Sequence, residues 1–182
     1  ERLADYFELV GRWNKRLHLV APCAPEEFAV RHVLESLAAA RHLGRGARFT
    51  DIGSGAGLPA IPCLVARADL TATLVEASAK KCVFLRESAA ALDLRGHVQV
   101  INSRFEELPA PEADAVTCRA LERFTELLPK ILEWSRPTAR LLLFGGQSLG
   151  EAIERTGRAV EPHLLPESER RFIFVVQPAT NS

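Results

Sequence analysis

The glycine-rich stretch DIGSGAG at residues 51–57 constrains the fold of this chain more than any other segment. It follows a short apolar run at 47–50 that is typical of a strand, and it precedes a helix-like run at 59–67. A strand, a glycine turn and a helix in this order form a cofactor-binding corner. Because glycine adopts positive φ and lets a ligand approach the backbone closely, the sequence predicts a cofactor site at this turn.

Strand-like and helix-like segments alternate through the rest of the chain. The order predicts a mostly parallel, seven-stranded α/β sheet with helices on both faces. The last two strands have no long crossover between them, so we expect an antiparallel hairpin at one sheet edge. The further strands are predicted at 71–75, 97–101, 113–117, 139–144, 160–165 and 171–177, and the helices at 79–92, 124–134 and 147–158.

Two helices are expected before the glycine turn. Apolar residues repeat at steps of three and four from Leu3 to Leu17, which indicates an amphipathic helix. A second helix is predicted from Pro25 to about His42, because proline at the first position followed by acidic residues is a start signal. We therefore expect a single domain over residues 1–182, with an N-terminal helical cap at 1–44 and a cofactor-binding α/β core at 45–182.

Composition narrows the possible partners. The formal net charge is zero, so a polyanion must be held by a local basic patch. The four cysteines and five histidines are scattered without ligand spacing, which predicts no metal site and favours buried, reduced thiols. The chain has no apolar run of membrane length, and we expect a cytoplasmic monomer that makes no membrane contact.

The spacing of the turn discriminates between cofactors. A dinucleotide fingerprint needs a third glycine where this chain has Leu58, and Pro59 removes an N–H group that a pyrophosphate would use. These two residues argue against a nicotinamide oxidoreductase. Glu76, at the end of the second predicted strand, can accept both ribose hydroxyls of an adenosyl cofactor, although a solvated strand-end glutamate is the alternative.

The stretch DIGSGAGLPAIP at 51–62 resembles motif I of the RsmG (GidB) family, whose members are class I methyltransferases that methylate guanine N7 in small-subunit ribosomal RNA. The resemblance covers nearly the whole chain. It implies the class I S-adenosylmethionine-dependent methyltransferase (Rossmann-like) fold. Other stretches resemble family motifs in the same order, namely WNK at 13–15 with RHVLESL at 31–37, TLVE at 73–76 with KK at 80–81 and FLR at 84–86, SRFEE at 103–107, and CRA at 118–120.

The resemblance also implies roles for residues at matching positions, with S-adenosylmethionine as the methyl donor. Gly53 and Leu58 would line the methionine–adenosine pocket, and Gly55 and Gly57 would let the cofactor approach the backbone. Glu76 would hold the ribose. These positions lie beyond the carboxyl ends of predicted parallel strands, where α/β sheets bind ligands.

Three further residues complete the implied cofactor site. Phe105 and Glu106 would flank the adenine, and Arg119 would face both the cofactor and the incoming base. Guanine N7 carries a free lone pair and no proton, so its methylation needs no general base. We therefore expect Arg119 to act by positioning, and catalysis to rest mostly on proximity and orientation.

Local positive charge is expected to hold 16S rRNA, either in the small ribosomal subunit or in an assembly intermediate. His32 is either a substrate contact or a hydrogen-bonded packing residue, and Trp13 fits core packing better than base stacking. The candidate RNA-binding residues are Arg12, Lys15, Arg16, Arg31, His32, Lys80, Lys81 and Arg123.

Departures from the family pattern leave the acceptor more open than the cofactor. The alternatives are a non-catalytic or retargeted descendant that binds RNA or the ribosome and retains the cofactor fold, and a methyltransferase for another substrate. The departures lie at His18, Val20, Glu35, Ala60, Phe144 and Gln177, the last two standing where lysine is usual.

Overall fold

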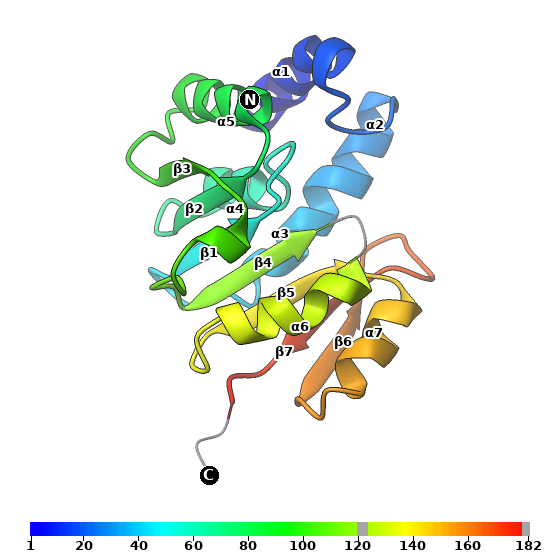
Figure 1. The fold of residues 1–182 in the computed structure, drawn as a ribbon. Helices are drawn as coiled ribbons and strands as arrows, with labels where there is room; N and C mark the ends of the chain where they lie inside the picture. The colour runs from blue at the N-terminus through cyan, green and yellow to red at the C-terminus, as the bar shows by residue number, and fades with distance from the viewer. Residues whose placement is uncertain (120–123, 180–182) are drawn as a thin grey trace.

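A seven-stranded sheet forms the centre of the computed structural model, which describes residues 1–119 and 124–179 (Figure 1). The strand order is β3-β2-β1-β4-β5-β7-β6. The first five strands pair in parallel, whereas β7 pairs antiparallel with β5 and β6. The strands are β1 (Arg48–Ile52), β2 (Thr71–Glu76), β3 (Val98–Asn102), β4 (Ala115–Arg119), β5 (Arg140–Gly145), β6 (Val160–Leu164) and β7 (Phe172–Val176).

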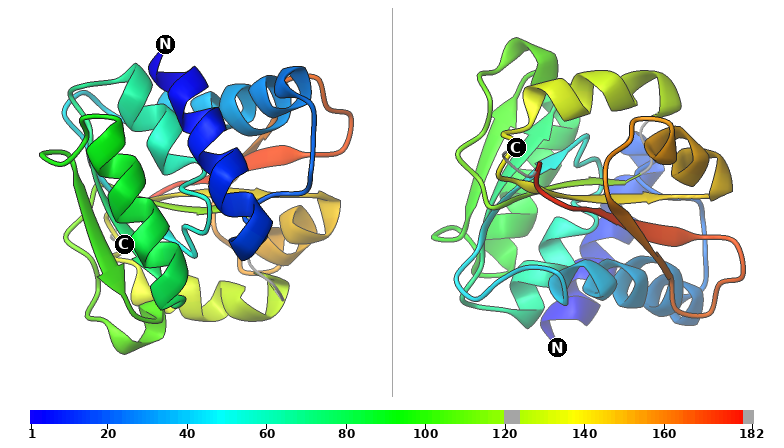
Figure 2. Two further views of the ribbon diagram at one scale, coloured as in Figure 1. Left: turned by 90° about the horizontal axis from the view of Figure 1, so that it is seen from above. Right: turned by 90° about the horizontal axis from the view of Figure 1, so that it is seen from below.

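Two helical layers cover the sheet (Figure 2). One layer packs N-terminal helices together with α4 and α5, and the other consists of α6 and α7. Each layer encloses its own apolar cluster, because buried strands present side chains to both faces. The helices are α1 (Arg2–Leu17), α2 (Pro25–Phe28), η1 (Ala29–Leu34), α3 (Glu35–Ala40), α4 (Ala60–Ala66), α5 (Ala79–Ala91), η2 (Phe105–Glu107), α6 (Phe124–Trp134) and α7 (Gln147–Glu154).

The expected topology is confirmed, including the antiparallel hairpin at the edge formed by β6. Two predicted elements differ from the structure: the last helix ends earlier than expected, and the fourth strand is shifted toward the C-terminus. The last helix ends at Glu154 instead of about 158, because Thr156 N–H bonds back to Ile153 O and Gly157 adopts a φ of 72°. The fourth strand begins at Ala115 rather than 113, since Asp114 turns its carboxylate to Arg48 N–H at 2.8 Å.

The second N-terminal helix is continuous over the predicted range but changes its hydrogen-bonding pattern. Its middle turn, η1, is a π-helix between the α-helical segments α2 and α3. A π turn inserts an extra residue into the helix and is frequently found at functional sites. Here it lies beside the carboxyl end of β4, so the helix brings residues 31–36 next to the end of that strand.

Candidate functional site

A cavity of about 620 Å³ lies beyond the carboxyl ends of β1 to β4. This is the edge where open α/β sheets bind ligands. A second cavity of about 580 Å³ lies against β1 to β3. Its lining contains none of the site residues that were predicted from the sequence. The 620 Å³ cavity is lined by Leu19, Val20, His32, Gly53, Ser54, Gly55, Ala56, Leu58, Val75, Glu76, Ala77, Lys81, Ser103, Arg104, Phe105, Glu106, Arg119 and Leu127.

Four of the five backbone amides from Gly53 to Gly57 are already hydrogen-bonded. Gly53 N–H and Ser54 N–H donate to Val75 O at 2.9 and 3.2 Å, and Gly57 N–H donates to Ser54 O at 2.6 Å. Gly55 N–H donates to Oε2 of Glu76 at 2.9 Å. A phosphate-binding turn instead points free N–H groups at its ligand. The turn therefore does not fit a pyrophosphate, in agreement with the prediction from Leu58 and Pro59.

Glu76 lies at the mouth of the turn, at the end of β2, with 8% of its surface exposed. Its Oε1 accepts from Ser78 N–H at 2.8 Å while its Oε2 accepts from Gly55 N–H. Each ionised carboxylate oxygen has a second acceptor site, so both can still receive a hydroxyl from the cavity. This fits the ribose-binding role proposed for Glu76, and the carboxylate would repel a phosphate in the same place.

Gly57 has a packing role that the motif did not reveal. A Cβ at Gly57 would lie 2.4 Å from Cδ1 of Ile61, so glycine is needed there for helix packing as well as for its φ of 85°. Pro59 caps α4, and the peptide bond between Leu58 and Pro59 is cis. Gly57 does not line the cavity, whereas Gly53, Gly55 and Leu58 do.

Phe105 and Glu106, which were predicted to flank the adenine, both line the cavity. Phe105 is only 6% exposed and packs edge-on against Trp134 at 5.4 Å between ring centroids. Glu106 lies 3.9 Å from Lys130 Nζ. The neighbouring Ser103 and Arg104 also line the cavity. Both follow β3 directly, so the strand-end rule that pointed to Glu76 would have found them.

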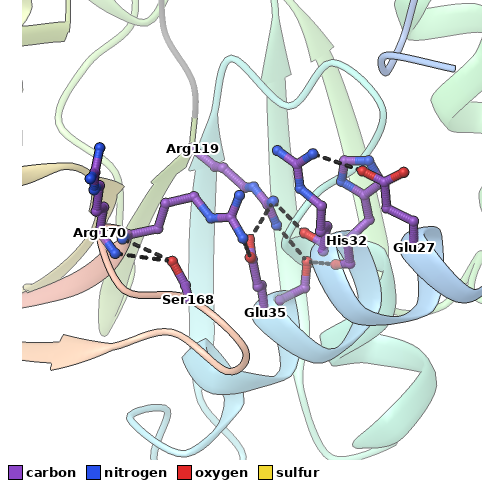
Figure 3. Close-up of polar contacts among 9 residues, drawn as sticks. Glu27, His32, Glu35, Arg119, Ser168 and Arg170 are labelled. Atoms are coloured by element: carbon purple, nitrogen blue, oxygen red, sulfur yellow. Dashed lines mark hydrogen bonds and ion pairs between the residues drawn. The ribbon is translucent and has the colours of Figure 1, made fainter. Parts of the chain in front are cut away.

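The Arg119 side chain lines the cavity, but its guanidinium turns toward η1 and α3 (Figure 3). Nη2 donates to Oε2 of Glu35 at 2.9 Å and to Arg31 O at 2.6 Å. The guanidinium carbon also lies 5.6 Å from the ring centre of Phe144. The guanidinium that was predicted to face the base is therefore already hydrogen-bonded within the protein.

His32 lines the cavity from the π turn, and its ring packs edge-on against Phe28 at 5.1 Å. Burial, reinforced by the positive charge of Arg119, lowers the pKa of His32 to about 4. The imidazole is therefore neutral near pH 7. Both predicted roles, packing and substrate contact, remain compatible with this position.

The predicted RNA-binding residues are only partly brought together. Lys81 lines the cavity, and Lys80 is exposed at the start of α5 beside it. Arg31 is exposed and pairs with Glu27 at 2.8 Å. The remaining three described residues are exposed on the last turns of α1, namely Arg12, Lys15 and Arg16, and Arg123 lies outside the described residues.

Trp13 belongs to the packing, as predicted. Its ring lies edge-on to Phe84 at 6.0 Å, and Nε1–H donates to Glu87 at 3.2 Å. Sequence reasoning missed two buried polar residues below the turn. Tyr6 donates its hydroxyl to Ala56 O at 2.5 Å, and Asp51 accepts from the Thr117 hydroxyl at 2.6 Å. Both bonds join distant segments, so no local pattern could have indicated them.

Three of the four cysteines, Cys63, Cys82 and Cys118, are buried, and all four are free thiols. Burial raises the pKa of Cys63 to about 12, which makes a nucleophilic role unfavourable. In the part of the chain that the structure describes, no group of three or more His, Cys, Asp or Glu side chains is placed to hold a metal ion. Among the described residues, no helix is long and apolar enough to cross a membrane.

Several solved structures with the same fold are described as methyltransferases. The chain matches the B. subtilis M1A22 tRNA methyltransferase TrmK with a TM-score of 0.66 and 19% identity, covering 81% of this chain and 66% of that one. It matches a SAM-dependent methyltransferase from Aquifex aeolicus with a TM-score of 0.63 and 17% identity, covering 84% and 93%. With the strand order and the strand-end cavity, this defines the class I S-adenosylmethionine-dependent methyltransferase fold.

Sequence relatives identify the family within this class. A family model described as GidB, rRNA small subunit methyltransferase G, matches residues 1–173. The ribosomal RNA small subunit methyltransferase G of Xanthomonas axonopodis pv. citri is 38% identical over 181 residues, which cover 95% of this chain and 84% of that relative. The chain belongs to the GidB family of S-adenosylmethionine-dependent methyltransferases, as the resemblance of its motifs predicted.

Proposed function

We propose that this protein methylates N7 of a guanine in 16S rRNA of the small ribosomal subunit. The observation that carries the proposal is the strand-end cavity, in which Glu76 closes a glycine turn with four amides already hydrogen-bonded. Membership of the GidB family supports the choice of acceptor. S-adenosylmethionine, when bound, supplies an electrophilic methyl group.

The chain's own residues would bind and orient the two reactants. Glu76 would accept the ribose hydroxyls, and the stem of Arg119 with Phe105 would enclose the adenosine and exclude water. Guanine N7 has a lone pair and no proton to remove. The neutral His32 and Arg119, which is paired with Glu35, therefore need not act as acid or base. Catalysis would rest on placing N7 in line with the methyl group.

The proposal extends to the setting of the reaction. Residues 1–44 would act as a cap on one methyltransferase domain, because α1 packs on α4 and α5 and the following helix reaches the end of β4. We propose a cytoplasmic monomer that acts on the small subunit or on an assembly intermediate. Sedimentation of the protein alone and with small subunits tests the oligomeric state.

Labelled cofactor and 30S subunits that lack the guanine modification test the function directly. We expect label in a guanine N7 of 16S rRNA from these subunits and little label in fully modified ones. Cofactor binding without label in any guanine N7 would overturn the proposal and favour a non-catalytic or retargeted protein.

Calorimetry separates the cofactor from the acceptor. We expect S-adenosylmethionine to bind and NAD to bind at least about 100-fold more weakly, because a pyrophosphate would meet the carboxylate of Glu76 and a turn with four amides already hydrogen-bonded. Tight binding of NAD alone would contradict the proposed chemistry.

A further inference from the structure

A buried ion-pair cluster joins three separate elements beside the cavity (Figure 3). Its centre is Glu35, at the start of α3, which is only 1% exposed. Oε2 of Glu35 lies 2.9 Å from Nη2 of Arg119, at the end of β4. Oε1 lies 2.6 Å from Nη2 of Arg171, which immediately precedes β7. One carboxylate therefore contacts a cation on each side.

The Arg119 side of the cluster fixes the π turn. Arg119 Nη2–H donates to Arg31 O at 2.6 Å, and Nη1–H donates to the hydroxyl of Ser36 at 3.3 Å. The Ser36 hydroxyl in turn donates to the carbonyl of His32. A π turn departs from the regular i→i−4 ladder, so side-chain donors to its carbonyls help to hold it. Arg119 and Ser36 thus determine where residues 31 and 32 lie relative to the cavity.

The Arg171 side of the cluster comes from the loop between β6 and β7. The loop is shaped by Ser168, whose hydroxyl accepts from Arg170 N–H at 3.4 Å and from Arg171 N–H at 3.0 Å. Arg171 is partly buried, with 37% of its side chain exposed, whereas Arg170 lies exposed at the surface. The loop therefore sends one arginine inward to Glu35 and leaves its neighbour at the surface.

A buried carboxylate is costly unless cations or donors compensate both of its oxygens. The Glu35 side chain contacts both guanidinium groups, one with each carboxylate oxygen. Without Arg171, Oε1 of Glu35 would lose its charged partner, and Glu35 would be free to turn. Arg119 would then lose its fixed direction, and with it the bond to the carbonyl of Arg31.

We propose that Arg171 and Glu35 are positioning residues, which hold the π turn and its His32 at the cavity through Arg119. The inference rests on the proposed function, because it assigns the hairpin loop a part in placing the guanine. It also makes the loop between β6 and β7 part of the site, although that loop lies far from the cofactor motifs in the sequence.

Steady-state kinetics of Arg171→Met test this role. We expect kcat for methylation of undermethylated 30S subunits to fall about tenfold, because the base is oriented less well. KM for the subunits and Kd for S-adenosylmethionine should change less than about threefold, and Arg171→Lys should restore most of kcat. If Arg171 instead contacted a phosphate, KM would rise, kcat would be unchanged, and the salt slope of RNA binding would fall by about 0.7. That pattern would overturn the proposal.

The double variant Glu35→Gln/Arg171→Met separates coupling from independent effects. We expect it to lose little more activity than Glu35→Gln alone, since that substitution already removes the charge with which Arg171 pairs. Fully additive losses would contradict a shared role. Arg170→Met is the matched control in the same loop and should keep wild-type kcat.

Amide hydrogen exchange provides a readout that does not need activity. In Arg171→Met we expect at least about tenfold faster exchange at residues 29–34, with α5 unchanged, and no such change in Arg170→Met. Unchanged exchange at residues 29–34 would overturn the inference even if the wild type methylates RNA. Faster exchange combined with a wild type that labels no guanine N7 would overturn only the proposed function.

Discussion

Glu76 makes two backbone hydrogen bonds and still faces the cavity, since an ionised carboxylate has more acceptor sites than those two bonds use. We expect Glu76→Gln to weaken S-adenosylmethionine binding about 10- to 100-fold, because charge-assisted bonds contribute about 1.5–3 kcal/mol. Titration calorimetry measures the change. Glu87→Gln is a suitable control, since Glu87 accepts from Trp13 outside the cavity. Equal affinity in both variants would remove Glu76 from the site.

Gly57 is required by the packing of α4. We expect Gly57→Ala to lower the free energy of unfolding by about 1–3 kcal/mol, because its Cβ would meet Ile61 and its φ is positive. Urea denaturation provides the measurement. Gly96→Ala should be close to neutral, since nothing lies within 4 Å of the added Cβ. A Gly57→Ala variant as stable as wild type would contradict this account.

The burial of Asp51 predicts that the stability of the protein depends on pH. Burial raises its pKa to about 7 from the ordinary 3.8, so the folded protein keeps a proton that the unfolded chain releases at lower pH. The free energy of unfolding therefore falls as pH rises through this window, by up to about 1.4 kcal/mol per pH unit. In Asp51→Asn, which keeps an acceptor for the Thr117 hydroxyl, we expect this decline to be absent. Urea denaturation of both proteins between about pH 5 and 8 tests it, and parallel curves would contradict it.

At the scale of elements, α1 supports the glycine turn through the hydroxyl of Tyr6. We expect Tyr6→Phe to destabilise the protein by about 1 kcal/mol and to weaken cofactor binding several-fold, because Ala56 O loses its buried donor. Trp13→Phe removes a hydrogen bond of the same helix to Glu87 and should leave the Kd for S-adenosylmethionine unchanged. Equal cofactor affinity in Tyr6→Phe and wild type would show that the turn does not depend on α1.

The elements were largely predictable, and their cross-contacts were not. The glycine turn, Leu58 and Glu76 lie within one βαβ unit, so local spacing was enough to place them at the cavity. The bond of Tyr6 to Ala56 and the pairing of Arg119 with Glu35 join residues 50 and 84 positions apart. No local pattern encodes such contacts. For the same reason the sequence did not show that the guanidinium of Arg119, expected to face the base, is hydrogen-bonded to η1 and α3.

At the scale of the whole molecule, a net charge of zero means that RNA must be attracted by local charges. Lys80 follows β2 and lies at the edge of the sheet that holds the cavity, whereas Arg95 precedes β3 at the opposite edge. We expect Lys80→Gln to lower the salt slope of RNA binding by about 0.7, as one lost phosphate contact would. Filter binding over a range of salt concentrations measures it. Arg95→Gln should keep the wild-type slope, and equal slopes in all three proteins would exclude Lys80 from the RNA surface.

The occupied amides of the glycine turn also bear on competition inside a cell. Adenine nucleotides share the adenosine group of the methyl donor and are abundant, yet each carries a phosphate chain at the 5′ position. In the turn, the N–H groups of Gly53, Ser54, Gly55 and Gly57 are already hydrogen-bonded and the carboxylate of Glu76 is negative, so the phosphate chain finds no favourable place there. The pocket would therefore stay open to its sulfonium-bearing ligand in the presence of ATP, and inhibitors directed at it should carry hydroxyls or a positive charge in place of phosphates.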